Sequence, residues 1–434
     1  MDISVITVFP NLYTEFFQTS LLKRAREQIK INFNVRAFSS FCAPKEHIDG
    51  PAAGHGSGMV IRPGVVQEAV ESQEALYGKA FKVFLTPQGK KFDQRVARQL
   101  ATQLASSNHV MFFSGRYEGI DQRAHEAYAD LELSLGDFVL MGGDLPVMVM
   151  IESLLRYVPG VIGQAESVEK DSFSGPFVDY PTYTAPAIWQ DRSIPEVLLN
   201  GNHAAAEAWR RSTAIKKSVI YHFDWVRRHA AEETDIKDIA RTIPPHYCVL
   251  MHSDVLVQKT VVGNSSVTSI DIHDIARSAK TYGIAKYFVV TALIDQQKIV
   301  RKILEFWDDA GIEYNKTRAD AVANVELKGS LDEVIAAIEQ VHGKRPLLLA
   351  TSARSSETKV SRIGYDDQAI VWGQERPVVL VFGTASGLSP DLIDRCDYLL
   401  PPLEGFSKYN HLSVRSAAAV VFDRWIGRKL DSSD

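Results

Sequence analysis

The spacing of apolar positions changes from segment to segment along the first part of the chain, and it predicts strands that alternate with helices. The β-rich runs expected as strands cover residues 3–9, 31–38, 80–85 and 110–114, and helical spacing covers residues 12–28, 63–77, 93–106 and 145–157. Strands separated by helices of about 10–15 residues are typical of βαβ units. We therefore expect an α/β fold with a mostly parallel sheet.

The same alternation begins again at Tyr247. Strands are expected at residues 247–251, 285–291, 346–350 and 377–383, and helices at residues 271–282, 295–310, 331–341 and 412–425. Helical spacing also covers residues 203–240, and the adjacent prolines Pro244 and Pro245 mark a boundary because paired prolines stop helices. We expect a first domain at 1–162, a linker at 163–175, a small helical domain at 176–243 and a further domain at 247–434.

Composition narrows the class of protein. The 434 residues, 45% of them hydrophobic and 23% charged, suit a globular chain of two or three domains. No stretch reaches the ~18 uninterrupted apolar residues of a membrane span, and the first residues lack the basic start of a secretory signal. Three distant cysteines (Cys42, Cys248, Cys396) form no metal-binding spacing and suit a reducing cytoplasm.

Basic residues gather in the helical region although the net charge of the whole chain is −5. The cluster comprises Arg210, Arg211, Lys216, Lys217, Arg227 and Arg228. Aromatic residues interleave with it at Trp209, Tyr221 and Trp225. Such a surface suits phosphates and bases of a nucleic acid, although a solvated helix face has the same pattern.

Three glycine-containing loops follow predicted strands in the first domain. They are FLTPQG (84–89), GRYEGIDQR (115–123) and LSLGDFVLMGGDLP (133–146). Gly136, Gly142 and Gly143 carry no Cβ, so the main chain there can pass close to a ligand. In parallel sheets ligands bind beyond the carboxyl ends of the strands, so we expect the three loops to converge. Asp137 and Asp144 are too far apart to form a metal cage.

These motifs resemble those of the tRNA guanine-N1 methyltransferases of the SPOUT class, over about Met1 to Ile243. The resemblance implies a trefoil knot, S-adenosyl-L-methionine (AdoMet) as methyl donor, assistance by Mg²⁺, and a homodimer whose interface holds the active site. Its substrate would be guanosine 37 of a tRNA, preceded by another guanosine. The donor site implied by the resemblance comprises Leu85, Pro87, Gly115, Tyr117, Glu118, Leu135, Gly136, Asp137, Phe138, Val139, Leu140 and Gly143.

The resemblance also assigns Asp171 as general base and Arg156 as the residue that attends O6 of the guanine. The chemistry suits these residue types, because the N1 proton must leave and the charge that spreads to O6 needs a cation. Asp171 could instead cap a helix ahead of Ser172, and Tyr117 and Glu118 could be an ordinary helix start.

One loop departs from the family pattern. The family carries an arginine or threonine, a proline and a tyrosine before a glycine run, whereas this chain has PAAGHGSGM at 51–59. The loss of the aromatic residue and the presence of His55 put the handling of the target base in doubt. We expect the donor site to be unaffected, and His55 could be an idle loop residue.

The sequences VLVFGTASGLSPDLI (379–393) and YLLPPLEGFSKYNHLSVRSAAAVVFDRW (398–425) resemble a second SPOUT-type RNA methyltransferase module, over about Tyr247 to Lys429. The implied fold is therefore two knotted parallel-sheet modules with a small helical domain between them. The second donor site would comprise Gly383, Thr384, Gly387, Leu388, Leu400, Pro402, Asn410 and Ser413. Candidate RNA contacts are Arg318, Arg354 and Arg415.

No residue of the second module stands out as a base. An O-methyl transfer to ribose and a non-catalytic role as a dimerisation or RNA-docking platform both stay open for this module. For the whole chain, a non-catalytic RNA-binding protein is the main alternative. An enzyme acting on small molecules fits less well, because such a substrate does not need the basic helical domain.

Overall fold

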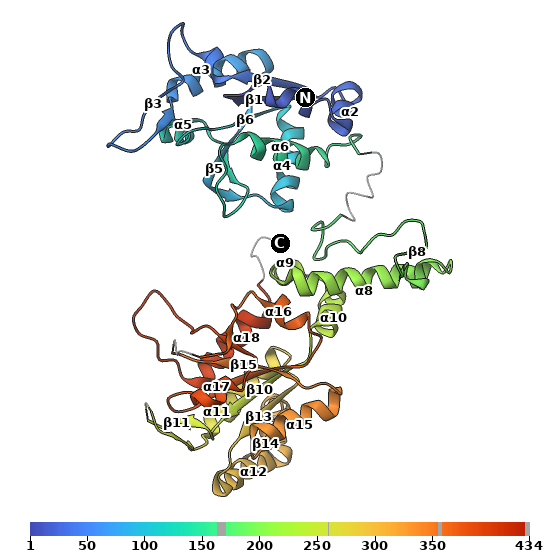
Figure 1. Ribbon diagram of the computed structural model, residues 1–434, viewed down its shortest axis with the longest axis vertical. Helices are drawn as coiled ribbons and strands as arrows, with labels where there is room; N and C mark the ends of the chain where they lie inside the picture. Colours follow the sequence, from blue (N-terminus) through green and yellow to red (C-terminus); the bar gives the residue numbers. More distant parts are fainter. Residues whose placement is uncertain (163–170, 259, 355–357, 430–434) are drawn as a thin grey trace. The chain divides into compact units, whose positions relative to one another are not determined.

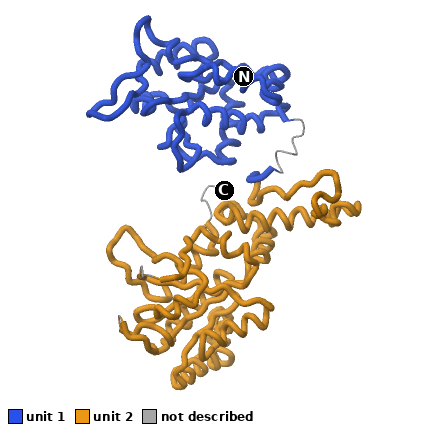
Figure 2. The backbone as a smooth tube through the Cα atoms, viewed as in Figure 1, with its two compact units in different colours: residues 1–174 blue, residues 175–434 orange. Residues whose placement is uncertain are grey.

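The computed structural model describes residues 1–162, 171–258, 260–354 and 358–429. The chain divides into two compact units, residues 1–174 and 175–434 (Figure 2). Of the expected linker at 163–175, residues 163–170 lie outside the described residues. Among the helices that the structure describes, none is long and apolar enough to cross a membrane.

The first unit is built on a five-stranded parallel sheet with the strand order β2-β1-β6-β5-β7 (Figure 1). Its elements are β1 (Asp2–Thr7), α1 (Leu12–Phe16), α2 (Ser20–Gln28), β2 (Asn32–Ala37), the 3₁₀ helix η1 (Phe38–Phe41), β3 (Asp49–Pro51), β4 (Met59–Ile61), α3 (Pro63–Tyr77), β5 (Phe81–Lys91), α4 (Gln94–Ser107), β6 (His109–Phe113), α5 (Gln122–Tyr128), β7 (Leu131–Ser134) and α6 (Asp144–Leu155).

The strands at the centre of this sheet are buried along their length. Every residue of β6 is buried, as are the last five of β1, which agrees with helices covering both faces of a parallel sheet. The predicted helix at 12–28 is wrong in one respect, because residues 17–19 interrupt it. Thr19 has an extended backbone, and its hydroxyl donates to the carbonyl of Phe16 at 2.7 Å, so α2 starts afresh at Ser20.

The second unit contains a seven-stranded parallel sheet with the order β14-β13-β10-β17-β15-β18-β16. Its elements are β8 (Ile188–Trp189), β9 (Arg192–Ser193), the 3₁₀ helix η2 (Glu196–Leu198), α8 (His203–Tyr221), α9 (Phe223–His229), α10 (Glu233–Thr242), β10 (His246–Met251), β11 (Val255–Leu256), β12 (Val262–Gly263), α11 (Ser269–Thr281), β13 (Lys286–Val290), α12 (Ile294–Asp308), α13 (Ala310–Tyr314), α14 (Lys316–Val322), β14 (Val325–Lys328), α15 (Leu331–His342), β15 (Leu347–Thr351), β16 (Ser361–Arg362), α16 (Gln368–Trp372), β17 (Val378–Gly383), α17 (Pro390–Asp394), β18 (Tyr398–Leu400) and α18 (Val414–Ile426).

The two sheets share one strand order. Without its edge strands β14 and β16, the second sheet reads β13-β10-β17-β15-β18, which matches β2-β1-β6-β5-β7 position by position. The predicted repeat of one architecture is therefore confirmed, and the loops after β5, β6 and β7 correspond to those after β15, β17 and β18. Strand order does not test the expected trefoil knots, which stay a prediction.

The helical region does not form a separate body. Residues 203–242, here called the helical segment, belong to the same compact unit as residues 247–434, and α8 contacts α16 (Figure 1). The sequence predicts a domain boundary at Pro244 and Pro245, whereas one apolar core runs across it from Val219 to Trp372. Paired prolines ended helix α10 here without ending the domain.

Candidate active site

The three glycine-containing loops of the first unit converge on one cavity of about 390 Å³. A volume of this size lies within the roughly 300–1,000 Å³ of small-molecule sites. Most of the predicted donor residues line it, namely Leu85, Pro87, Gly115, Tyr117, Glu118, Leu135, Phe138, Val139, Leu140 and Gly143. Gly136 and Asp137 do not, and the side chain of Asp137 is 93% exposed and paired with Lys91.

Close approach of two backbones explains the glycines of the third loop. The amide of Gly143 donates to the carbonyl of Gly115 at 2.9 Å. A Cβ at Gly143 would lie 2.9 Å from Cα of Ser114, which real Cβ atoms do not tolerate. Gly143 therefore allows the third loop to pack directly against the second at the edge of the cavity.

Asp144 is the buried anchor of this site. The residue is only 1% exposed. Its carboxylate accepts hydrogen bonds from the hydroxyls of Thr7 at 2.5 Å, Ser114 at 2.7 Å and Tyr13 at 3.1 Å. Burial, and then the charge of Asp144, raise the pKa of Tyr13 well above its usual range. A buried charge needs such partners, because its desolvation is costly.

Arg116 completes the anchor and joins two of the loops. Its guanidinium donates to Asp144 Oδ2 through Nε at 3.1 Å and Nη2 at 2.7 Å, and through Nη1 to the carbonyl of Met141 at 3.2 Å. A Cβ at Gly142 would collide with this side chain. Neither Asp144 nor Arg116 was predicted as a site residue. A single acidic residue in one motif and a single basic residue in another do not indicate that the two form an ion pair.

The loop that departs from the family pattern touches the donor site. It forms the tip of the β3–β4 hairpin, and the amide of Glu118 donates to the carbonyl of Met59 at 3.0 Å. A Cβ at Gly58 would lie 2.6 Å from the side chain of Glu118. These contacts come from Gly58 and Met59 and not from His55 or the residues before it, so the expectation that the altered loop leaves the donor site unaffected stays a prediction.

Arg156 and Asp171 form an ion pair, with Nη2 of the arginine donating to Oδ2 of the aspartate. Arg156 follows the end of α6, and Asp171 opens the passage after residues 163–170. Among the described residues of the first unit, neither belongs to the lining of the donor cavity. The structure thus brings the two predicted catalytic residues to each other but does not bring them to the donor loops within the described chain.

Comparison with known families decides what this arrangement belongs to. The family model described as tRNA (Guanine-1)-methyltransferase TrmD matches residues 1–228, more than half of the chain. The chain belongs to the tRNA (guanine-N1)-methyltransferase family. A second model, described as SAM-dependent RNA methyltransferase, matches residues 245–427. The predicted family resemblance of both modules is thereby confirmed.

Relatives within the tRNA (guanine-N1)-methyltransferase family are of two lengths. A protein of that name from Oleidesulfovibrio alaskensis is 34% identical over 99% of this chain and 100% of its own, and one from Nitratidesulfovibrio vulgaris is 34% identical over 98% and 99%. The enzyme named the same way from Bacillus subtilis is 37% identical over 55% of this chain and 98% of its own. The two-module layout is therefore shared by some relatives only.

The second module has a larger cavity, of about 990 Å³, at the equivalent end of its sheet. Predicted residues that line it are Gly383, Thr384, Gly387, Leu388, Asn410 and Ser413, together with Arg354 and Arg415. Leu400 and Pro402 are not in the lining, where their neighbours Pro401 and Leu403 stand instead. Arg318 lies elsewhere, with its guanidinium over the ring of Trp307 at 5.7 Å.

A polar wall of the second cavity contains the predicted Arg415 together with residues that were not predicted. Thr268 donates to Asp271 at 2.6 Å, and Arg415 donates to the other oxygen of Asp271 at 3.3 Å. Behind them His252 contacts the hydroxyl of Ser265 at 3.0 Å. Burial lowers the pKa of His252 to about 4, so its ring is neutral at pH 7. His252, Ser265, Thr268 and Asp271 follow β10, a strand whose loop contains no glycine motif, whereas Arg415 lies on α18.

The basic cluster is divided between surface and core. Lys217 is exposed, and Arg210 lies over the ring of Tyr180 at 5.2 Å. Arg211 and Arg228 are paired with acids of their own segment, and Lys216 is paired with Glu375. Arg227 is 2% exposed and paired with Asp366 at 3.1 Å, so its prediction as an RNA contact is corrected.

Proposed function

We propose that this chain transfers a methyl group from AdoMet to N1 of guanosine 37 in tRNA, with preference for a guanosine preceded by another guanosine. The observation that carries the proposal is the convergence of the three family loops on one cavity in the first unit. AdoMet supplies an activated methyl group on a sulfonium. The protein has to orient the guanine, remove the N1 proton and stabilise charge on O6.

Asp171 and Arg156 suit the last two tasks. Their ion pair places a proton acceptor and a fixed cation side by side. When guanine enters, Arg156 exchanges Asp171 for O6, and the released carboxylate takes the N1 proton. Such a preorganised cation contributes on the order of a few kcal/mol to the transition state.

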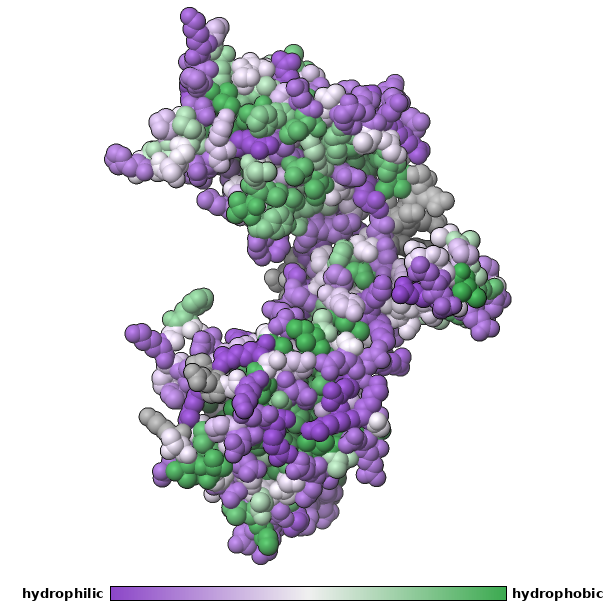
Figure 3. Space-filling model, viewed as in Figure 1, coloured by the Kyte–Doolittle hydropathy of each residue, from purple (hydrophilic) through white to green (hydrophobic). Residues whose placement is uncertain are grey.

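A homodimer would bring this pair to a donor cavity. The cavity loop exposes apolar side chains, with Val139 84% and Met141 93% exposed, and Leu145 and Val149 continue the surface along α6. Figure 3 shows apolar side chains gathered on the visible face of the first unit. Exposed apolar patches mark interaction sites. We propose that a second copy covers this loop and offers its own Asp171 to the cavity.

The exposed cations of the helical segment are proposed to hold the tRNA phosphates. Arg210, Lys217 and Arg228 reach solvent at least in part, and Tyr221 is 67% exposed among them. We place the reaction in the cytoplasm, in agreement with three cysteines that are all free thiols. For Mg²⁺, the described residues include no group of three or more His, Cys, Asp or Glu side chains able to hold an ion, so no step is assigned to it.

The test is methyl transfer from labelled AdoMet to unmodified tRNA transcripts, followed by nucleoside analysis. We expect 1-methylguanosine at position 37 from the wild type. Asp171→Ala should lower kcat by at least about 100-fold with unchanged AdoMet affinity, since general bases contribute roughly 10²–10⁴-fold. Glu68→Gln, which removes one exposed carboxylate from α3 and not from the α6 surface, is the matched control. Near-normal turnover by Asp171→Ala would exclude it as the base.

For the second module we infer a second AdoMet site, at its cavity of about 990 Å³. The equivalent strand order and the matching loops support this assignment. Methylation of another RNA site would then require a second modified nucleoside from the full chain. Titration should find two donor sites per chain, and one after Gly383→Ala, because a Cβ there would lie 2.5 Å from the amide of Leu388.

The alternative is that the second module is a non-catalytic dimerisation or RNA-docking platform. A single donor site in the wild-type chain would favour it. A chain that binds tRNA and AdoMet but forms no modified nucleoside would instead be a non-catalytic RNA-binding protein.

A further inference from the structure

The helical segment and the second module are built around one apolar core. The segment contributes Ile215, Val219, Phe223, Val226, Ala230 and Ile239, and the same cluster continues through residues of β10, α11, α16 and α18. The ring of Phe223 meets that of Trp372 edge-on at 4.7 Å. Without the second module these apolar side chains would face water, which is unfavourable in proportion to their area.

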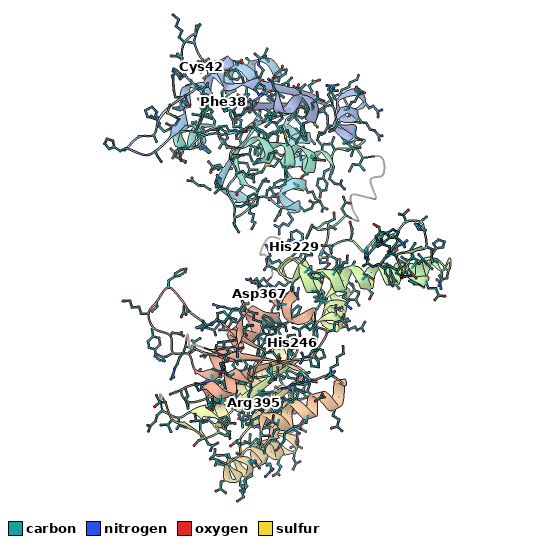
Figure 4. The ribbon with its side chains drawn as sticks, in the orientation of Figure 1. Phe38, Cys42, His229, His246, Asp367 and Arg395 are labelled. Carbon is teal, nitrogen blue, oxygen red and sulfur yellow. The ribbon has the colours of Figure 1, made fainter. Side chains whose placement is uncertain are left out.

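Buried polar contacts fasten the same junction. Arg227, on α9, pairs with Asp366 and donates Nη1 to the carbonyl of Arg424 at 2.8 Å. The chain that follows α18 contacts the helical segment again, where the amide of Lys429 donates to the carbonyl of Arg227 at 2.9 Å. Nearby, His246, which Figure 4 labels in the second unit, accepts hydrogen bonds from the indoles of Trp372 and Trp425. At this junction Arg227 is buried, whereas the carboxylate of Asp366 is 79% exposed.

The passage after the proposed general base is fastened to this body too. The indole of Trp225 donates to the carbonyl of Gly175 at 2.9 Å, and the amide of Val178 donates to the hydroxyl of Ser218 at 2.8 Å. Phe177 packs against the shared core. Only Ser172, Phe173 and Ser174 separate Asp171 from Gly175, and each residue spans at most ~3.6 Å. Asp171 is therefore on a short tether whose far end is anchored.

From these contacts we propose that the second module is a structural support. It positions the helical segment and the tether of Asp171 for methylation by the first module, whether or not the second module catalyses a reaction of its own. This inference rests on the proposed function. It assigns the second module a role in tRNA handling and in proton removal, but none in AdoMet binding by the first module. The B. subtilis relative, matched over 98% of its own length by 55% of this chain, has no room for such a module, so the dependence belongs to the two-module chains.

Two substitutions in the full-length chain loosen the junction from opposite sides. Phe223→Ala removes the ring that meets Trp372. Asp366→Asn removes the carboxylate of the second module that pairs with buried Arg227, leaving its partner Asp224 within the helical segment. Asp320→Asn on α14, an exposed position of the same module, is the matched control. The measurements are kcat/KM for unmodified tRNA in formation of 1-methylguanosine, KM for AdoMet in the same assay, and amide hydrogen exchange of residues 203–242.

We expect faster exchange in residues 203–242 and a loss in kcat/KM for tRNA of about tenfold for Phe223→Ala and about threefold for Asp366→Asn. KM for AdoMet should stay within about twofold, and hydrogen exchange of residues 1–162 should stay as in the wild type, which general unfolding of the protein would not allow. If Phe223→Ala fails to fold, Asp366→Asn alone carries the test, because it keeps the size of the side chain.

Unchanged exchange, or faster exchange with kcat/KM within twofold of the wild type, would overturn the inference. Failure of the proposed function is recognised separately. It would appear as no 1-methylguanosine from the wild type, or as normal turnover by Asp171→Ala, before any junction variant is made.

Discussion

Asp144→Asn is the most informative single change in the first unit. The substitution keeps the size of the side chain but removes the charge that binds Arg116 at 2.7 Å, and it leaves three hydroxyl donors around one carbonyl oxygen. Removing one partner of a buried ion pair costs about 3–5 kcal/mol. The Arg116 side chain is 22% exposed and can recover some hydration, so we expect a loss of about 2–4 kcal/mol in the stability of this unit.

Part of this loss should appear as weaker AdoMet binding, because Arg116 also holds the carbonyl of Met141 in the donor loop. If about half of this free energy is lost from AdoMet binding because the loops are held less firmly, KM for AdoMet rises roughly tenfold, since 1.4 kcal/mol corresponds to a factor of ten. The methylation assay at saturating tRNA measures this KM, and urea unfolding measures the stability.

Glu68→Gln is again the control, because it removes an exposed carboxylate from α3 of the same unit. Surface changes of this kind stay within about 0.5 kcal/mol. If Asp144→Asn unfolds at the wild-type urea concentration and keeps the wild-type KM, the donor loops are held by other contacts and the reasoning fails.

Three further predictions concern backbone space, pH and the second module. Gly143→Ala should raise KM for AdoMet at least tenfold without changing KM for tRNA, because its Cβ would meet the backbone of Ser114 at 2.9 Å; an unchanged KM would show that the loops can separate freely. Burial lowers the pKa of His246 to about 4, against about 6.5 in an unfolded chain, so the stability that the neutral ring contributes is complete above pH 6.5 and is lost as the pH falls toward 4. His246→Gln should therefore remove about 2 kcal/mol of the difference between unfolding at pH 7 and pH 5, and an equal pH dependence in both proteins would contradict it. Arg415→Met should weaken AdoMet or RNA binding by the second module and leave 1-methylguanosine formation unchanged. Calorimetry in the Gly143→Ala background, in which AdoMet binding by the first module is weakened, measures binding by the second module alone. Normal binding by Arg415→Met in this assay would exclude the ion pair between Arg415 and Asp271 as part of the second site.

Local sequence determined the elements and the donor loops. Helix α3 was predicted with the bounds that the structure shows, because Pro63 starts it and Gly78 ends it. Glycines that permit close backbone approach, placed after β-rich runs, predict that the three loops converge, and in the structure they line one cavity. Such features act over a few residues, so they are readable from order and residue type alone.

Tertiary structure decided which residues work together. Nothing in the sequence joins Asp144 to Arg116, or Arg227 to Asp366, because these pairs depend on how distant segments pack. The basic cluster looked uniform as a sequence, yet Arg227 is buried while Lys217 is exposed. Paired prolines predict a domain boundary, but one apolar core continues across it. Burial of apolar side chains is favourable against any complementary apolar surface, whichever segment provides it.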